Sequence, residues 1–380
     1  MAVDRVLPTD EARELLALVR EIVRDEVAPH AAAYEERSEY PGDVVRLLGK
    51  SGLLGLAYPK EYGGGGMPYE VYLQVLEEIA SGWAAVALAV SVHTLSCYPV
   101  AAFGTEQQKR AHLPDMLGGE QLGAYSLSEA TSGSDAGSLQ ARARRDGDDY
   151  VLNGTKAWVT HGGVADYYNV FCRTSDDARG GVSTLLVPAD AGGLHPQPPE
   201  KKMGLRSSPT AQIVLEDVRV PADRLVGTEG DGMRIALSAL DAGRLGISAV
   251  ATGLAQAALE ASVEWAKERR QFGRPIADNQ GVSFLLADMA TGIEAARASY
   301  LSAARRRDAG EPYAPQAAMA KLFATDTAMR VTTDAVQVFG GYGYTSEYPV
   351  ERYLREAKVM QIFEGTNQIQ RLVIGRALLR

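Results

Sequence analysis

The spacing of apolar residues changes twice along the chain and divides it into three regions. From Thr9 to about residue 118, apolar side chains recur every three or four positions, the spacing of amphipathic helices. Thr9 is expected to cap the first helix, and Pro29 to end or kink it. The stretch from Trp83 to Phe103 has no Asp, Glu, Lys or Arg over a membrane-spanning length, but it is rich in Ala and diluted by Ser, Thr and Pro. We therefore predict a helix buried in a soluble core.

The pattern between about residues 122 and 227 is that of strands, because β-branched and aromatic residues alternate with turn residues there. Segments 168–172, 182–187 and 211–220 are strand candidates. Asn153-Gly154 lies between two further apolar segments, and this pair is the strongest short signal for a two-residue hairpin turn. We therefore predict a hairpin at Asn153-Gly154.

Long segments rich in Ala, Leu, Glu and Arg follow Asp231 and contain almost no proline, which predicts helices of a bundle. The predicted helical segments are 233–270, 280–308, 314–339 and 348–379. Their length exceeds what one small core requires, so part of their apolar surface is expected to pack against another subunit. The predicted fold is α+β with an N-terminal α-helical domain (1–121), a β-barrel-like middle domain (122–229) and a C-terminal domain of the four-helix-bundle type (230–380).

Composition narrows the classes of function. The chain has 380 residues, 46% of them hydrophobic, and a net charge of -9, which supports a large core and makes nucleic acid an unlikely ligand. The short basic runs Arg269-Arg270 and Arg305–Arg307 are interpreted as solvated helix ends. The two cysteines are far apart with no metal-ligand spacing, and no targeting segment is recognised. We predict a cytoplasmic protein with no metal and no membrane association.

The motifs of several enzyme classes are missing from the sequence. Gly49-Lys50-Ser51 lacks the earlier glycine of a phosphate loop, and no GxSxG elbow is present. The five histidines never have HExxH spacing, and there is no Rossmann fingerprint. The sequence therefore gives no basis for a hydrolase, a metalloenzyme or a nicotinamide-dependent enzyme.

Polar and aromatic residues gather in several segments where a plain core would be apolar. A strand that ends near Ser128 leads into a loop rich in Ser, Thr and Gly, whose N–H and hydroxyl groups suit a phosphate or a heteroaromatic edge, although an ordinary Ser/Gly turn has the same composition. Trp158 and Thr160 are two positions apart and so share one strand face. The motifs are SEATSGSDAGS (128–138), WVTHGG (158–163), ERRQFGRPI (268–276), QVFGGYGY (337–344) and IFEGTNQIQR (362–371).

Together and in this order, these motifs resemble the acyl-CoA dehydrogenase family over nearly the whole chain. The resemblance implies FAD as cofactor, an acyl-CoA substrate and a homotetramer. It also implies electron-transfer flavoprotein as the electron acceptor and a place in fatty acid β-oxidation. LDAGRLGI (240–247) is most similar to the short-chain, butyryl-type branch. The sequence does not determine the length of the acyl chain.

The resemblance assigns site residues by position. Around the flavin ring and ribityl chain it implies Tyr125, Leu127, Ser128, Trp158 and Thr160. For the FAD pyrophosphate and adenosine it implies, from a partner subunit, Arg269, Phe272, Gln280, Gln337 and Gly341. Thr366 and Gln368 would complete the FAD site. The expected substrate contacts are Ser134, Asp241, Arg244 and Gly365.

Glu364 is the expected catalytic base. Family members have the base either in the segment matching IFEGT or on the helix matching LDAGR, and in this chain the second position is Gly243. Glu364 also follows an apolar run and precedes a helix that Thr366 can cap, so its carboxylate is expected to be partly buried. A helix-end surface glutamate is the alternative interpretation from the residues alone.

Other functions remain open at this stage. A relative acting on a carrier-protein thioester, or in the enoyl-reductase direction, would have the same motifs. Oxygenase-type relatives tend to lack the glutamate that is retained here. A catalytically silent scaffold is disfavoured, because both the flavin-contacting set and Glu364 are present.

Overall fold

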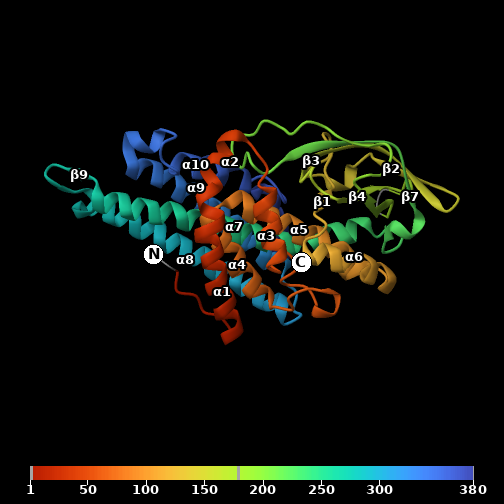
Figure 1. The fold of residues 1–380 in the computed structure, drawn as a ribbon, viewed down its shortest axis with the longest axis horizontal. Coiled ribbons are helices and arrows are strands. Elements are labelled where there is room, and N and C mark those ends of the chain that lie inside the picture. The colour runs from red at the N-terminus through yellow and green to blue at the C-terminus, as the bar shows by residue number, and fades with distance from the viewer. Residues whose placement is uncertain (1–2, 178–179, 380) are drawn as a thin grey trace.

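The computed structural model describes residues 3–177 and 180–379, and it confirms the predicted three-part architecture (Figure 1). The N-terminal helices are α1 (Asp10–Ile22), α2 (Ala31–Arg37), α3 (Gly42–Lys50), α4 (Tyr69–Gly82), α5 (Ala84–Phe103) and α6 (Glu106–Gly118). Thr9 caps α1, because its hydroxyl accepts a hydrogen bond of 3.1 Å from the N–H of Ala12. The regular helix ends at Ile22, before the expected position, and a π-helical turn (Val23–Val27) continues the chain to a 3₁₀ turn at Pro29, where a break was predicted.

Helix α5 is the buried helix that the uncharged stretch predicts. Helices α5 and α7 (Gly232–Glu268) are both long and apolar enough to cross a membrane, but 78% of the most apolar window of each is buried inside the protein. They also pack against each other, and α4 packs against both. Their composition is therefore explained by a core position within this fold.

The middle domain is an eight-stranded mixed sheet. Its strands are β1 (Gly123–Ser126), β2 (Arg142–Asp146), β3 (Asp149–Thr160), β4 (Tyr167–Arg173), β5 (Val182–Pro188), β6 (Leu194–Pro196), β7 (Thr210–Pro221) and β8 (Leu225–Val226). They are arranged in the order β6-β7-β3-β2-β4-β5-β8, and β1 pairs with β4 in parallel. The three strand candidates of the sequence correspond to β4, β5 and β7.

The hairpin predicted at Asn153-Gly154 is wrong. Strand β3 runs through both residues with a register shift against β7, and the actual turn lies between Asp146 and Asp149. The side chain of Asn153 exchanges hydrogen bonds of 2.9 and 3.0 Å with Asp217 of β7, and a Cβ on Gly154 would collide with Ala141. The pair therefore makes a bulge with close backbone approach, which needs the same residue types as a turn.

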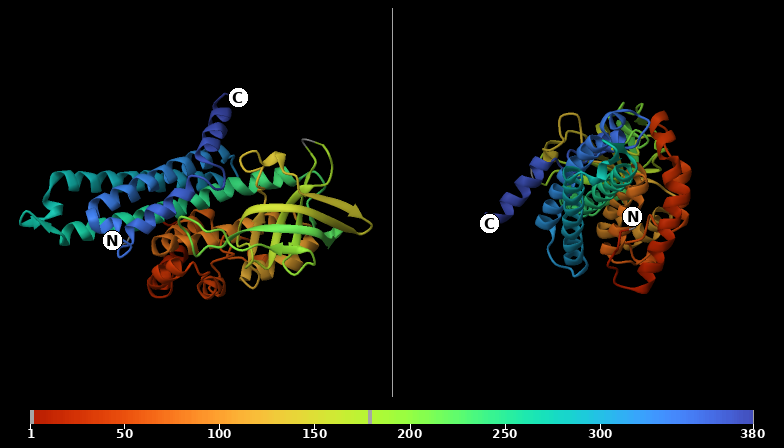
Figure 2. Two further views of the ribbon diagram at one scale, coloured as in Figure 1. Left: turned by 90° about the horizontal axis from the view of Figure 1, so that it is seen from above. Right: turned by 90° about the vertical axis from the view of Figure 1, so that its left-hand side faces the viewer.

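Long helices form the C-terminal domain: α7, α8 (Gln280–Asp308), α9 (Ala314–Phe339), α10 (Val350–Met360) and α11 (Asn367–Leu378). The segment predicted as one helix, 348–379, is two helices separated by residues 361–366. A small hairpin, β9 (Arg270–Gln271) with β10 (Arg274–Pro275), lies between α7 and α8. In Figure 1 this hairpin and the sheet occupy opposite ends of the long axis, and Figure 2 shows α11 projecting from the body.

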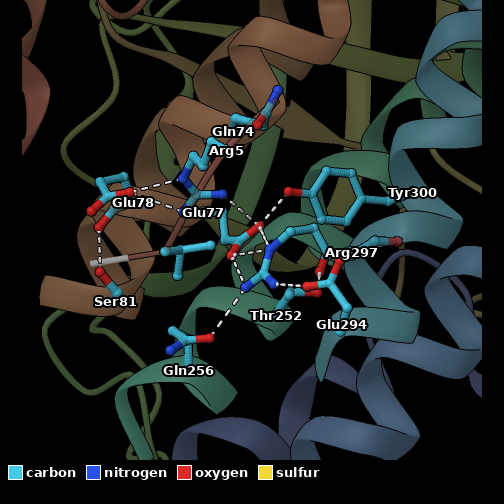
Figure 3. A network of polar contacts seen from close by, with 12 residues as sticks. Arg5, Gln74, Glu77, Glu78, Ser81, Thr252, Gln256, Glu294, Arg297 and Tyr300 are labelled. Atoms are coloured by element: carbon cyan, nitrogen blue, oxygen red, sulfur yellow. Dashed lines mark hydrogen bonds and ion pairs between the residues drawn. The ribbon is translucent and has the colours of Figure 1, made fainter. Parts of the chain in front are cut away.

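A buried network around Glu77 of α4 joins the N-terminal segment to the bundle (Figure 3). Glu77 forms ion pairs with Arg5 at 3.1 Å and with Arg297 of α8 at 2.8 Å, and it accepts a hydrogen bond from Tyr300. Burial alone would raise the pKa of Glu77, but the two guanidinium groups outweigh burial and hold the pKa below its usual value. Glu77 is thus a charged, fully partnered carboxylate in the core.

Candidate active site

Glu364 lies in the break between α10 and α11, and its backbone has an unusual conformation. Its φ is 50°, a left-handed value that is uncommon for a residue with a side chain, and Gly365 follows with φ 87°. The side chain of Gln370 donates hydrogen bonds to the carbonyls of Glu364 and Gly365 at 3.3 and 2.8 Å. Thr366 caps α11 by accepting from the N–H of Ile369 at 3.3 Å, as predicted. The surrounding contacts thus hold a strained turn in place.

The carboxylate of Glu364 is buried without a partner. Part of the residue remains accessible, but both carboxylate oxygens are shielded from solvent and have no hydrogen bond to any described residue. Burial raises its pKa from 4.5 to about 7, although the cations of Lys321 and Arg244 act in the opposite direction. A carboxylate with a pKa near 7 is a stronger base than an ordinary glutamate, and it is available to accept a proton at neutral pH.

Gly243 of α7 makes room for that carboxylate. A Cβ built on Gly243 would overlap Oε2 of Glu364 and would lie 3.3 Å from Cδ1 of Leu95. Gly243 and Leu95 are also walls of a narrow pocket between α4, α5 and α7. The carboxylate therefore lies against the wall of a pocket, in the space that a side chain at residue 243 would occupy.

Lys321 and Arg244 are the cations nearest to the base. Lys321 of α9 is fully buried, and its Nζ donates at 2.9 Å both to the Gly365 carbonyl and to Oδ1 of Asn367. Burial lowers the pKa of Lys321 to about 8. Arg244 is buried and forms an ion pair with Asp241 one turn earlier on α7, where burial raises the pKa of the Asp241 carboxyl. These two substrate-contact candidates, Asp241 and Arg244, thus lie on the helix that faces Glu364.

The structure brings the first two motifs together in the middle domain. The Ser128 carbonyl accepts a hydrogen bond of 2.9 Å from the N–H of Ala157, which joins the end of β1 to β3. Tyr125 of β1 packs against Phe171 and donates to the carbonyl of Ala236 at 3.2 Å. Burial and, after it, the charge of Glu364 raise the pKa of Tyr125. Tyr125 therefore lies within electrostatic reach of the base, while Leu127 is buried beside it in the sequence.

Trp158 is presented to the outside by a bulge. The β3 register shifts between Lys156 and Val159, and Trp158 has a left-handed φ of 61°. Trp158 is 62% exposed, and Thr160, beyond the bulge, is half-buried. An exposed aromatic face beside half-buried hydroxyl groups fits a flat heteroaromatic ligand such as an isoalloxazine ring.

A second set of predicted cofactor residues lies at the other end of the molecule. Arg269 ends α7 and lies over the ring of Tyr342 at 5.2 Å, close to Gly341 at the end of α9. Phe272 lies in the β9–β10 hairpin with φ 50° and is 99% exposed. Gln280 and Gln337 are also exposed. Within one chain this set is therefore far from the strands that contain Tyr125 and Trp158 (Figure 1). A second subunit would be needed to bring the two sets together.

The remaining predicted residues lie on the surface or in the turn. Thr366 and Gln368 line a polar hollow at the start of α11, together with Lys358 and Arg371. Ser134 is exposed in the loop after β1. Gly365 is fixed by the hydrogen bonds that its carbonyl accepts. The described residues contain no group of three or more His, Cys, Asp or Glu side chains that could hold a metal ion.

Sequence reasoning missed Lys321 and Gln370, which hold the turn at Glu364. Both are fully buried polar residues. Lys321 lies on the same face of α9 as the buried residues Ala317, Ala324 and Ala328, because successive members of this series are three or four positions apart. A lysine in the apolar phase of a helix is rarely free of function, because burying its charge is costly. That signal was available in the sequence.

Comparison with known proteins identifies the class that this fold and site define. Sequence models of the acyl-CoA dehydrogenase N-terminal, middle and C-terminal domains match residues 9–120, 124–218 and 230–379. The chain therefore belongs to the acyl-CoA dehydrogenase family, a family of flavin-dependent oxidoreductases, and it is an enzyme of that kind.

Individual relatives cover nearly all or all of the chain. The acyl-CoA dehydrogenase of Bacillus subtilis (strain 168) is 46% identical over 373 residues, which is 98% of each chain. Butyryl-CoA dehydrogenase from Megasphaera elsdenii superposes with a TM-score of 0.97 at 41% identity and covers all of both chains. A chain in a structure described as the electron transferring flavoprotein of Acidaminococcus fermentans also superposes over all of both chains, with a TM-score of 0.97 at 42% identity.

Proposed function

We propose that this enzyme dehydrogenates an acyl-CoA thioester between Cα and Cβ, giving the trans-2-enoyl thioester, with Glu364 as the base that removes the α-proton. The observation that carries the proposal is the Glu364 carboxylate, which is buried, free of hydrogen bonds and adjacent to a pocket. A structural carboxylate in a core is normally partnered, as Glu77 is. A carboxylate without a partner is suited to receive a proton from a ligand.

The geometry of the turn supports two roles for Glu364. Its side chain takes the proton, and substrate binding would remove more water and strengthen it as a base. Its backbone N–H donates to no group in the described part of the chain, so it is free to donate to the thioester carbonyl. Such a donor stabilises the negative charge that develops on the carbonyl oxygen when the α-proton leaves.

The residues present fit FAD, which when bound supplies the acceptor for the β-hydride. Trp158 and Tyr125 would cover the ring, while Ser128 and Thr160 provide polar groups at its edge. Arg269 suits a pyrophosphate because a guanidinium group binds phosphate oxygens with paired hydrogen bonds. Since Arg269 lies at the end of the molecule opposite to the sheet that contains Trp158, we propose that it acts in the site of a neighbouring subunit.

A homotetramer is the assembly that we propose. Large apolar side chains are exposed on the hairpin, on α8, in the turn before α11 and on α11 itself, which projects from the body (Figure 2). Monomeric proteins rarely leave such apolar surface uncovered. The exposed side chains are Phe272, Phe284, Ile362, Leu372 and Leu378. We also propose electron-transfer flavoprotein as the acceptor of the electrons, in line with the relative from Acidaminococcus fermentans.

The test is anaerobic mixing of the FAD-loaded enzyme with butyryl-CoA, followed by the loss of flavin absorbance. Glu364→Gln should keep FAD but bleach more slowly by about 10²–10⁴-fold, the usual contribution of a general base. Glu356→Gln is the matched control, because Glu356 is also buried with a pKa raised to about 8 but lies beside Arg352 and not beside the pocket. Bleaching by Glu364→Gln at the wild-type rate would refute the proposal.

A further inference from the structure

The pocket beside Glu364 contains a positively charged residue that the dehydrogenation chemistry does not use. Arg307, near the end of α8, is one of its lining residues, with Tyr69, Leu95 and Gly243. The sequence interpretation of Arg305–Arg307 as a solvated helix end is wrong for Arg307, which is half-buried. Its guanidinium lies over the ring of Tyr69, 3.7 Å from the ring centroid.

Arg307 differs from its neighbours in having no acidic partner. Arg305 pairs with Glu70 at 2.8 Å, and Arg306 pairs with Glu311 at 3.1 Å. Asp308 caps α4 by accepting from two backbone N–H groups. Within residues 3–177 and 180–379, no carboxylate forms an ion pair with Arg307, and the groups that act on it are tyrosines, of which Tyr313 is hydrogen-bonded to it. A guanidinium group has several N–H donors, so a half-buried cation with one tyrosine hydroxyl as its hydrogen-bond partner has donors to spare.

Two of the three tyrosine hydroxyls around Arg307 are engaged elsewhere, and the third, that of Tyr313, is hydrogen-bonded to Arg307. Tyr58 donates to the carbonyl of Thr94 at 2.5 Å, and Tyr69 donates to the carbonyl of Ala242 at 2.9 Å. The N–H donors of Arg307 that Tyr313 does not use are therefore available to a ligand in this part of the pocket. An anion that entered the pocket would find a charge partner and would also remove the cost of burying an unpaired charge.

Tyr69 connects Arg307 to the base. Burial raises the pKa of Tyr69, and the charge of Glu364 raises it further while that of Arg307 lowers it. The charges of Glu364 and Arg307 therefore both influence the pKa of Tyr69, which lines the pocket. An acyl group whose Cα is at Glu364 would extend along the wall formed by Leu95 and Gly243 and past Tyr69 to Arg307.

We propose that Arg307 binds a carboxylate at the far end of the acyl group, so that the preferred substrate is an ω-carboxyacyl thioester and not a plain alkanoyl thioester. This inference rests on the proposed function. A carboxylate is the best match among the groups that an acyl chain can carry, because a guanidinium donates two parallel hydrogen bonds to it.

The test compares two thioesters of equal chain length, glutaryl-CoA and pentanoyl-CoA, in anaerobic bleaching of the FAD-loaded enzyme. Wild type should half-bleach at a lower concentration of glutaryl-CoA, by about 10-fold or more. Arg307→Met should remove this preference but leave the half-bleaching concentration of pentanoyl-CoA within about threefold of the wild-type value. Arg307→Lys should retain part of the preference for glutaryl-CoA. Arg306→Met, which removes a neighbouring surface charge, is the matched control and should behave as wild type.

Two results would overturn the inference while the proposed function stands. The first is a wild-type enzyme that bleaches with pentanoyl-CoA at least as readily as with glutaryl-CoA. The second is an Arg307→Met variant that raises the half-bleaching concentrations of both thioesters equally but does not raise those of the S-acyl pantetheine thioesters. That result would assign Arg307 to the phosphates of CoA. If neither thioester bleaches bound FAD in wild type, it is the proposed function that fails.

Discussion

Glu77 and Glu364 are both glutamates whose carboxylates are buried in this chain, yet they have opposite surroundings. Glu77 has two guanidinium partners and a tyrosine hydroxyl, and its pKa is lowered. Glu364 has no hydrogen-bond partner, and its pKa is raised to about 7. The arrangement around Glu77 stabilises the folded chain, whereas the carboxylate of Glu364 is buried at a cost in stability and is available to accept a proton. Burial alone therefore does not distinguish a structural carboxylate from a catalytic one; the charged and hydrogen-bonding partners, together with the position beside a pocket, do.

Removing the charge of Glu77 should give the largest change in stability. Glu77→Gln would leave Arg5 and Arg297 with only their outer carboxylate partners, Glu78 and Glu294, and we expect the free energy of unfolding to fall by about 3–5 kcal/mol. Because the folded pKa of Glu77 is lowered, its stabilisation is present above the unfolded pKa near 4.5 and is lost as pH falls through the lower folded value. Denaturant unfolding at pH 7 and pH 4 measures this. Glu294→Gln, which removes the exposed partner of Arg297, should change stability by less than about 1 kcal/mol.

Glu364→Gln should have the opposite pH signature in the same unfolding experiment. The folded pKa of Glu364 is raised, so its relative stabilisation is present below about pH 4.5 and is lost as pH rises through about 7. The wild-type chain therefore bears a cost of up to about 3 kcal/mol at pH 8 that the variant avoids. Relative to wild type, the variant should gain about 2–3 kcal/mol between pH 5 and pH 8. A difference that stays constant with pH would show that the carboxylate is not desolvated.

Gly243→Ala tests the space beside the base. The added methyl group would overlap Oε2 of Glu364, so the carboxylate must move, and a displacement near 1 Å costs up to about 10²-fold in rate. The rate of anaerobic bleaching should fall while FAD remains bound. Gly118→Ala is the control, because nothing lies within 4 Å of its added methyl group. An unchanged rate in Gly243→Ala would mean that the base has a different position during the reaction.

Lys321→Met should have the smallest effect on rate and the most specific one. The change removes the donor to the Gly365 carbonyl and the nearest charge that lowers the pKa of Glu364. We expect the bleaching rate at pH 7 to fall by about fivefold and to recover near pH 9, because the apparent pKa of the base rises by about one unit. Lys267→Met, on the exposed part of α7, should leave the profile unchanged. A uniform loss at all pH values would indicate a structural role only.

The sequence predicted the architecture well where long periodic segments decide it. Helices α7, α8 and α9 begin and end within about two residues of the predicted segments, since their apolar spacing is unbroken over many turns. The hairpin at Asn153-Gly154 failed because β2, with its arginines and Asp146, does not have the composition of a strand. Charged side chains are tolerated there because every residue of β2 except Ala143 is exposed or half-buried. Periodicity did not show this.

The sequence motifs located the candidate site, but the charges and contacts around Glu364 could be found only from the structure. Glu364 and Thr366 could be named from the order of motifs, whereas the contact between Glu364 and Gly243 joins residues 121 positions apart, 364 minus 243, on different elements. The residues predicted to bind FAD lie at two ends of one chain, and their union depends on a subunit that the sequence cannot position. The positive charge of Arg307 in the pocket was hidden by its neighbours Arg305 and Arg306, which have surface partners.

The pH dependence of anaerobic flavin bleaching by excess acyl-CoA tests the central claim most directly, since it reports the protonation of the base in the working enzyme. We predict that the rate rises with pH through an apparent pKa of about 7 or slightly above and then levels off, and that this rise is absent in Glu364→Gln. A wild-type rate that is constant between pH 5.5 and 9, or a rise centred near 4.5, would contradict a desolvated Glu364 as the base.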